Sequence, residues 1–138
     1  MSELQNAVLC IEAKPENYNI MMDFVDSKLK LYSTDIINQV KIAIDEIFSN
    51  IYQYAYRPET GQVKITIFLT NYITLQFEDK GIPFNPLETD YPDLTKSADE
   101  RVLGGLGVFI VKQLMDSIEY KRDGDTNILT LKKSVKYA

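Results

Sequence analysis

Glu46 and Asn50 stand four residues apart in a segment whose apolar residues repeat with helical spacing. Their side chains should therefore emerge on one face of a helix, one turn apart, beside the apolar stripe of Ile47 and Ile51. An Asn carbonyl is a hard oxygen ligand of the kind that Mg²⁺ accepts, and a nearby carboxylate can act as a general base. A solvated helix flank has the same spacing, so the pair alone leaves both interpretations open.

Asp79 begins a second group, Asp79-Lys80-Gly81-Ile82-Pro83-Phe84, at the predicted end of a strand. A carboxylate in this position can accept a hydrogen bond from the exocyclic amine of a nucleobase. Gly81 would let the loop pass close to the ring, because glycine has no Cβ. A plain Asp-x-Gly turn contains the same residues and is the alternative.

The third group is Gly104-Gly105-Leu106-Gly107, which runs directly into apolar residues 108–115. A glycine turn that opens a helix points free N–H groups and the positive end of the helix dipole at one place, and this favours an anion. The P-loop pattern is absent, and Ile110 stands where a dinucleotide fingerprint needs its third glycine. A glycine-rich connector ahead of a core helix remains the alternative.

Composition narrows the classes of function. The chain has 138 residues, a net charge of −5 and no histidine. The acidic balance argues against direct nucleic-acid binding, and the missing histidine excludes Ser-His-Asp chemistry and histidine autophosphorylation within this chain. The N-terminal residues lack the pattern of a signal peptide, no apolar run is long enough to span a bilayer, and Cys10 is the only cysteine. We therefore expect a cytoplasmic protein without a membrane segment.

The elements that must position these groups follow from periodicity and turn residues. The pattern predicts a strand, two helices (the first with Ile20 on its apolar face, the second capped by Ser33 or Thr34), a hairpin, a long loop, a third helix and a second hairpin. The predicted ranges are 7–13, 17–31, 34–54, 63–69, 72–78, 79–104, 105–115, 118–121 and 127–132, with one short helix near 97–102. This order predicts a single α/β domain over residues 1–138, a two-layer sandwich.

The three groups together, in this order and spacing, resemble the Bergerat-fold (GHKL) ATPase superfamily. The short length resembles its anti-sigma-factor serine/threonine kinases. Residues 45–56 look like the N box of that family, and Asp79-x-Gly81-x-Pro83-Phe84 looks like its first glycine box. Gly105-Leu106-Gly107 with the helix that follows looks like the second. The resemblance implies a histidine-kinase-like fold whose mixed, mostly antiparallel sheet carries three helices on one face.

The resemblance also implies a role for each matching residue. Asn50 would bind Mg²⁺ and Glu46 would be the catalytic base. Asp79 would read the adenine amino group of ATP, with Gly81 beside the ring and residues 85–104 as the ATP lid. The implied nucleotide-binding residues are Asn50, Asp79, Gly81, Pro83, Gly104, Gly105, Leu106 and Gly107. Lys96 and Arg101 in the lid are either γ-phosphate contacts or solvated charges.

Three positions depart from the family pattern. Tyr54 stands where a histidine often follows the glutamate, and Pro83 stands where the superfamily commonly has glycine. A threonine near the adenine on a late strand is missing, so Asn127 or Thr126 would have to take its place.

The implied activity is phosphoryl transfer from ATP to a serine or threonine of a STAS-type anti-sigma-factor antagonist. The implied partners also include a sigma factor, which the protein would sequester, and a second copy of this chain in a homodimer. A nucleotide-gated binding module without kinase activity is one alternative. A stand-alone ATPase domain related to sensor histidine kinases is another.

Overall fold

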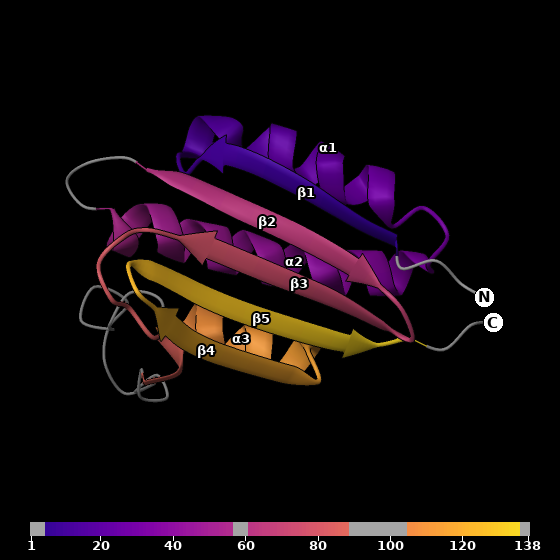
Figure 1. Ribbon diagram of the computed structural model, residues 1–138. Coiled ribbons are helices and arrows are strands. Elements are labelled where there is room, and N and C mark those ends of the chain that lie inside the picture. Colours follow the sequence, from indigo (N-terminus) through magenta and orange to yellow (C-terminus); the bar gives the residue numbers. More distant parts are fainter. Residues whose placement is uncertain (1–4, 57–60, 89–104, 136–138) are drawn as a thin grey trace.

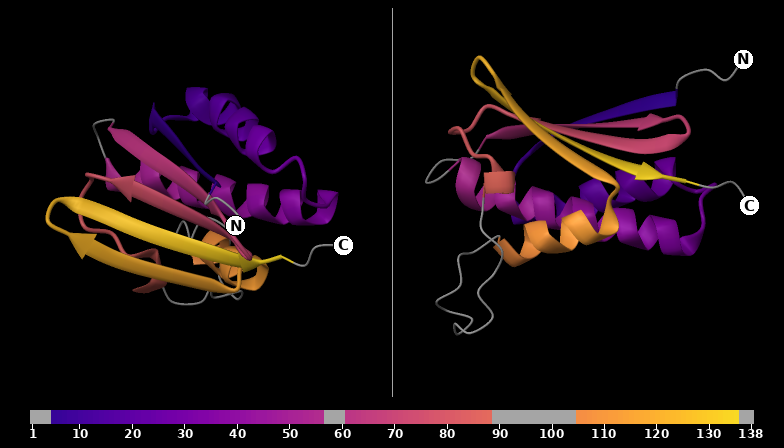
Figure 2. Two further views of the ribbon diagram at one scale, coloured as in Figure 1. Left: turned by 45° about the vertical axis from the view of Figure 1, so that its right-hand side comes forward. Right: turned by 90° about the horizontal axis from the view of Figure 1, so that it is seen from below.

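The structure, a computed structural model, describes residues 5–56, 61–88 and 105–135 (Figure 1). These residues form one five-stranded sheet, with three α-helices against one of its faces (Figure 2). The strands are β1 (Gln5–Glu12), β2 (Gln62–Leu69), β3 (Tyr72–Asp79), β4 (Ser117–Asp123) and β5 (Thr126–Ser134). The helices are α1 (Tyr18–Lys28), α2 (Thr34–Asn50) and α3 (Gly105–Leu114). The predicted two-layer α/β sandwich is confirmed.

The strand order is β1-β2-β3-β5-β4, which places β3 at the centre. The prediction of a mostly antiparallel sheet is confirmed, since all four pairings between the described strands are antiparallel. Phe77 on β3 lies opposite Ile65 and Leu129, and all three are buried under the helices. One pleat further along the same face, Asp79 lies opposite Asn127. The register therefore delivers a polar pair to the end of an apolar sheet face.

Helix α2 supplies most of the helical side of the core. Ser33 caps it, since its hydroxyl accepts a hydrogen bond from the N–H of Ile36 at 3.3 Å. The predicted alternative, Thr34, is instead the first helical residue. The buried residues of the helix fall on one face, as the apolar spacing predicts: Val40, Ala43, Ile44, Ile47, Phe48 and Asn50. Asn50 is the polar residue among them.

The chain continues from α2 into a π-helix at Ile51–Ala55. The predicted extent of this helix, to about residue 54, is confirmed, but its last turn is wider than an α-turn. The carbonyl of Ala55 leaves the helical ladder and accepts a hydrogen bond from the N–H of Ile82 at 2.9 Å. The π-turn thus ties the end of this helix to the loop after β3, and such turns are frequent at functional sites.

Two expectations differ from the structure or fall outside it. Ile20 is 51% exposed, so its predicted place on the buried face of α1 is wrong. The buried arc of α1 consists of Met21, Met22 and Val25, which turns Ile20 toward solvent. The predicted short helix at 97–102 lies outside the described residues, where the long loop is seen only as far as a 3-10 helix at Pro86–Glu88.

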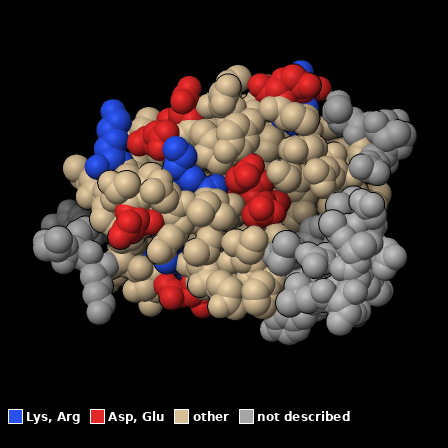
Figure 3. Space-filling view, turned by 180° about the vertical axis from the view of Figure 1, so that it is seen from behind, with Lys and Arg blue, Asp and Glu red and all other residues tan. Residues whose placement is uncertain are grey.

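The helical side of the molecule carries charges of both signs. Figure 3 shows Asp, Glu, Lys and Arg side chains interspersed over the described part of this face, without a continuous basic patch. None of the described helices has the length and apolar character needed to cross a membrane.

Candidate functional site

Asp79 lies at the end of β3 and is only 6% exposed. Its Oδ1 accepts two hydrogen bonds, from the backbone N–H of Gly81 at 3.0 Å and from Nδ2 of Asn127 at 2.9 Å. No described residue donates a hydrogen bond to its other oxygen, Oδ2. The side chain therefore offers one acceptor to a ligand.

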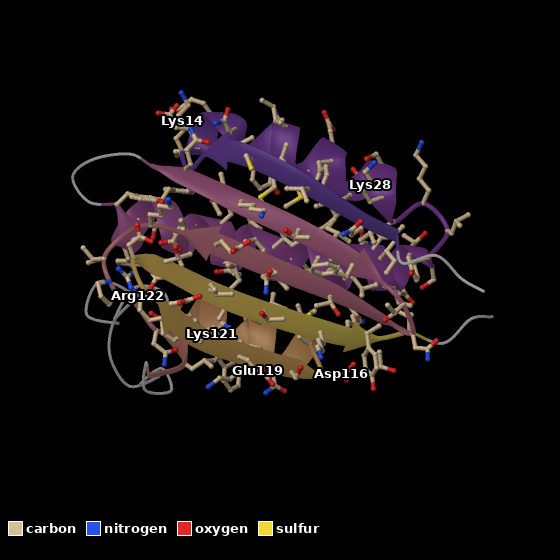
Figure 4. The ribbon with its side chains drawn as sticks, in the orientation of Figure 1. Lys14, Lys28, Asp116, Glu119, Lys121 and Arg122 are labelled. Atoms are coloured by element: carbon tan, nitrogen blue, oxygen red, sulfur yellow. The ribbon has the colours of Figure 1, made fainter. Side chains whose placement is uncertain are left out.

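Burial raises the pKa of Asp79, because the ionised carboxylate is poorly solvated there. Three groups oppose this effect without cancelling it: the two N–H donors, from Asn127 and Gly81, and the charge of Arg122. Arg122 lies at the end of β4 beside the loop that follows β3 (Figure 4), where its guanidinium donates to the carbonyl of Gly81 at 2.8 Å. Arg122 thus supports both the loop and the ionised form of Asp79.

A narrow cleft opens beside Asp79 between the sheet and the end of α2. The space inside it that a water-sized molecule can occupy is about 20 Å³. Its walls are mainly apolar, with a few polar groups that converge on it, which is typical of a small-molecule site. The lining residues are Ile47, Asn50, Ile51, Ala55, Phe77, Asp79, Phe84, Pro86, Tyr120, Asn127 and Leu129.

Asn50 lies across this cleft from the sheet, in the last turn of α2, and is 5% exposed. Its Nδ2 is buried, and no described residue accepts a hydrogen bond from it. A buried polar atom without a partner is rare in a folded protein and costs stability unless a ligand or water completes it. The unpartnered Nδ2 therefore fits an acceptor on a ligand in the cleft, such as a phosphate oxygen. The carbonyl oxygen of the same amide is of the kind that Mg²⁺ accepts.

Glu46 lies one turn before Asn50 and faces the first turn of α3. A Cβ added to Gly107 would collide with its Oε2, so the carboxylate lies directly on the backbone of that glycine. Burial raises the pKa of Glu46, and the neighbouring charge of Asp45 raises it further. A carboxylate with a raised pKa beside the start of a helix is suited to take up a proton.

Phe84 forms the outer wall of the cleft together with Pro86. Its ring stacks on that of Tyr54, with centroids 5.6 Å apart and planes 23° apart. Tyr54 belongs to the π-helix, so the stack is a second link between the end of α2 and the loop after β3. The residue at the histidine position of the family pattern therefore packs on the wall of the cleft.

The other predicted site residues have different outcomes. A Cβ on Gly81 would collide with the backbone of Ala55, so the close approach that requires glycine is made to the π-helix. Pro83 is exposed and does not line the cleft. Gly105 begins α3, as the second glycine box requires, whereas Gly104 lies outside the described residues. Lys96 and Arg101, like most of the predicted lid, also lie outside them.

The structure adds Tyr120 and Arg122, which the sequence analysis did not select. Strand alternation could have indicated them, because both fall on the same face of β4 as the apolar Ile118. Asn127 takes the late-strand position, while Thr126 points to the other side of the sheet and bonds to Asp125. In the part of the chain that the structure describes, no three His, Cys, Asp or Glu side chains are grouped so that they could hold a metal ion.

Comparison with known proteins shows the family of the chain. Residues 11–133 match the histidine kinase-like ATPase domain family, and the chain belongs to that family. It is 31% identical over 106 residues to Serine-protein kinase RsbW of Bacillus cereus (strain AH820) and, by the same figures, to that of Bacillus thuringiensis (strain Al Hakam). Each match covers 73% of this chain and 66% of the relative, so the chain spans just under two thirds of their length.

Among solved structures, the Acinetobacter baumannii histidine kinase AdeS is similar, with a TM-score of 0.51 at 15% sequence identity. The match covers 96% of this chain and 68% of that one. It shows that the fold is the histidine-kinase-like ATPase fold.

Proposed function

We propose that this chain is an ATP-dependent protein serine/threonine kinase that holds the adenine of ATP in the cleft beside Asp79. The observation that carries the proposal is the convergence of three side chains. Asn50 and Asp79 line the same cleft, and Glu46 lies one turn from Asn50, against the start of α3. The similarity to serine-protein kinases adds support.

The residues fit the nucleotide in separate ways. Oδ2 of Asp79 would accept a hydrogen bond from the adenine amino group. Asn50 would hold Mg²⁺, which supplies charge neutralisation to the phosphates when bound. The N–H groups of Gly105, Leu106 and Gly107 belong to the first turn of α3, where backbone donors lack helical partners and attract an anion.

Glu46 would act on the hydroxyl of the protein substrate. Its carboxylate accepts the hydroxyl proton while the oxygen bonds to the γ-phosphorus, and ADP leaves with the electrons of the broken bond. The raised pKa of Glu46 suits this role, because a base whose pKa is closer to the operating pH shares the proton more effectively.

The partners of this kinase rest on the family resemblance. We propose a STAS-type anti-sigma-factor antagonist as the phosphoryl acceptor, and a sigma factor as a protein that the chain sequesters. We also propose a homodimer in the cytoplasm as the working form. Light scattering would test the dimer, since one chain has a mass of 15.8 kDa. A single-chain mass at every concentration used for kinase assays would contradict it.

A nucleotide-gated binding module is the second candidate. It is favoured by the close approach of the Glu46 carboxylate to Gly107, because a carboxylate packed against the first turn of α3 has less room beside it for a substrate hydroxyl. In this case ATP would bind and no phosphoryl group would be transferred.

The test incubates the protein with Mg²⁺, γ-labelled ATP and purified STAS-domain proteins, and follows the label on serine and threonine. We expect Glu46→Gln to lower the rate about 10²- to 10⁴-fold while leaving ATP affinity nearly unchanged. Asp23→Asn, an exposed carboxylate change on α1, is the matched control. Transfer at the wild-type rate by Glu46→Gln would remove Glu46 as the base. Binding without transfer by the wild type would support the second candidate.

A further inference from the structure

Asn127 is 4% exposed and uses its whole amide within the protein. Its Nδ2 donates to Oδ1 of Asp79 at 2.9 Å and to the carbonyl of Ile82 at 2.8 Å. Its Oδ1 accepts from the hydroxyl of Tyr120 at 2.5 Å and from the N–H of Phe84 at 3.4 Å. An Asn side chain has two N–H donors and two acceptor lone pairs, so every position is taken. Asn127 has no donor left for a ligand.

The orientation of this amide is determined by its neighbours. The carbonyl of Ile82 can only accept a hydrogen bond, and the N–H of Phe84 can only donate one. If the amide oxygen and nitrogen of Asn127 were exchanged, an oxygen would face the carbonyl of Ile82 and an NH₂ group would face the N–H of Phe84. The hydroxyl of Tyr120 must therefore be the donor in its bond to Oδ1.

The amide in turn controls which oxygen of Asp79 meets a ligand. Oδ1 already accepts from Asn127 and Gly81, so Oδ2 is the acceptor that remains for a bound molecule. A proton taken up by this carboxyl would have to sit on Oδ2, because N–H donors occupy Oδ1. Oδ2 therefore accepts a hydrogen bond when Asp79 is ionised and donates one when it is protonated.

We infer that Asn127 is a positioning residue that makes the cleft select a 6-amino purine over a 6-oxo purine, by holding Asp79 with Oδ2 as its single free acceptor. This inference rests on the proposed function, which places a purine nucleotide here. An adenine amino group donates to Oδ2, whereas the carbonyl oxygen of guanine would oppose it. Sites built around one buried hydrogen bond reject such an analogue strongly.

The same arrangement makes the selection depend on pH. The charged and titratable groups that act on Asp79 in the described residues are Arg122 on β4 and Tyr56, which directly follows the π-helix. Tyr120 on β4 is linked to Asp79 through Asn127. Burial raises the pKa of Asp79, and the N–H donor of Asn127 is the strongest of the influences that lower it. Loss of that donor should raise the pKa of Asp79 further. Oδ2 would then become protonated, and stop accepting a hydrogen bond, at a higher pH than in the wild type.

Calorimetry with Mg-ATP and Mg-GTP between pH 5 and 8.5 tests the inference. We expect the wild type to bind ATP about 100-fold or more tightly than GTP. Asn127→Leu should weaken ATP binding about tenfold or more, change GTP binding little, and move the pH at which ATP binding is lost upward. Thr130→Val, on the opposite face of β5, is the matched control and should leave all three values unchanged.

Tyr120→Phe provides a second variant in case Asn127→Leu fails to fold, as judged by circular dichroism. It keeps the ring, removes the hydroxyl that orients the amide, and should lower the ATP-to-GTP ratio about threefold or more. Equal losses for both nucleotides with an unmoved pH midpoint, or an unchanged ratio in both variants, would overturn the inference alone. Failure of the wild type to bind ATP would overturn it together with the proposed function.

Discussion

At the scale of single residues, the site contains polar groups that folding alone does not favour. Asp79 is nearly buried, and desolvation outweighs the hydrogen bonds and the Arg122 charge that favour its ionised form. Asn50 buries an amide nitrogen that no described residue accepts. Both residues lower the stability of the empty protein, and both face the same cleft. Polar groups that lower the stability of the folded protein are typical of binding sites.

The poor solvation of the ionised Asp79 carboxylate predicts how Asp79→Asn changes the free energy of unfolding. Because burial raises the pKa of Asp79 above that in the unfolded chain, the folded state takes up the proton first, and wild-type stability gains from this group as the pH falls. The neutral amide avoids the desolvation penalty and can still accept from Asn127 and Gly81. The variant should therefore have the higher free energy of unfolding at pH 8, with a gap that narrows toward pH 4.

Urea unfolding at both pH values measures this gap. Asp23→Asn on the exposed side of α1 is the control and should leave the free energy of unfolding unchanged at either pH. A variant that is less stable than the wild type at pH 8 would show that the ionised carboxylate stabilises the empty protein.

Asn50→Ala gives a second prediction at this scale. Since Nδ2 has no described partner, its removal loses no hydrogen bond, and the free energy of unfolding should change by about 1 kcal/mol or less. The affinity for Mg-ATP should fall about tenfold or more if Asn50 holds the metal. Asn38→Ala, an exposed change on the same helix, is the matched control in both denaturation and calorimetry. Unchanged Mg-ATP affinity would remove Asn50 from the site.

At the scale of elements, the junction between the π-helix and the loop after β3 positions the cleft. Gly81 packs on the backbone of Ala55, whose carbonyl accepts from the N–H of Ile82. Gly81→Ala should therefore destabilise the protein by about 3 kcal/mol, because a methyl group here meets backbone that cannot move aside easily.

Gly124→Ala is the matched control for that substitution. Gly124 has a φ of 60° and open space around it, so the variant should lose only about 1 kcal/mol through backbone strain. Guanidinium unfolding of both variants gives the comparison. Equal losses would contradict the close packing of Gly81 on the π-helix.

The sequence predicted this framework well because most of it follows from periodicity and turn residues. Both hairpins alternate along their strands, and Ser33 is a strong helix cap, so these features are visible locally. The π-turn at Ile51–Ala55 was not predictable, because one extra residue per turn leaves no sequence signature. The role of Gly81 was also hidden, since its neighbour Ala55 is far away in sequence.

In the candidate site too, some features could be predicted from the local sequence and others could not. The order and spacing of Glu46, Asn50 and Asp79 predicted its polar residues, two of which line one cleft in the structure. The hydrogen bonds of Asn127 required the register of β3 with β5, and Tyr120 required the register of β4. Such long-range pairings are set by tertiary packing.

At the scale of the whole molecule, the sandwich places its polar cleft at the end of an otherwise apolar layer. The helical layer contributes Asn50, the sheet contributes Asp79 and Asn127, and the loop after β3 contributes Phe84. A ligand in the cleft would contact all three parts and should stabilise the fold by mass action. We propose that this ligand is ATP, recognised through Asp79.

Calorimetric titration of the wild type and of Asp79→Asn with Mg-ATP at pH 8 measures how far ATP binding depends on Asp79. The wild type should bind one ATP per chain. The variant should remain folded, yet lose about 100-fold or more in affinity, because its amide turns an N–H donor toward the adenine amino group. Equal ATP affinity in the two proteins would show that Asp79 does not recognise the adenine.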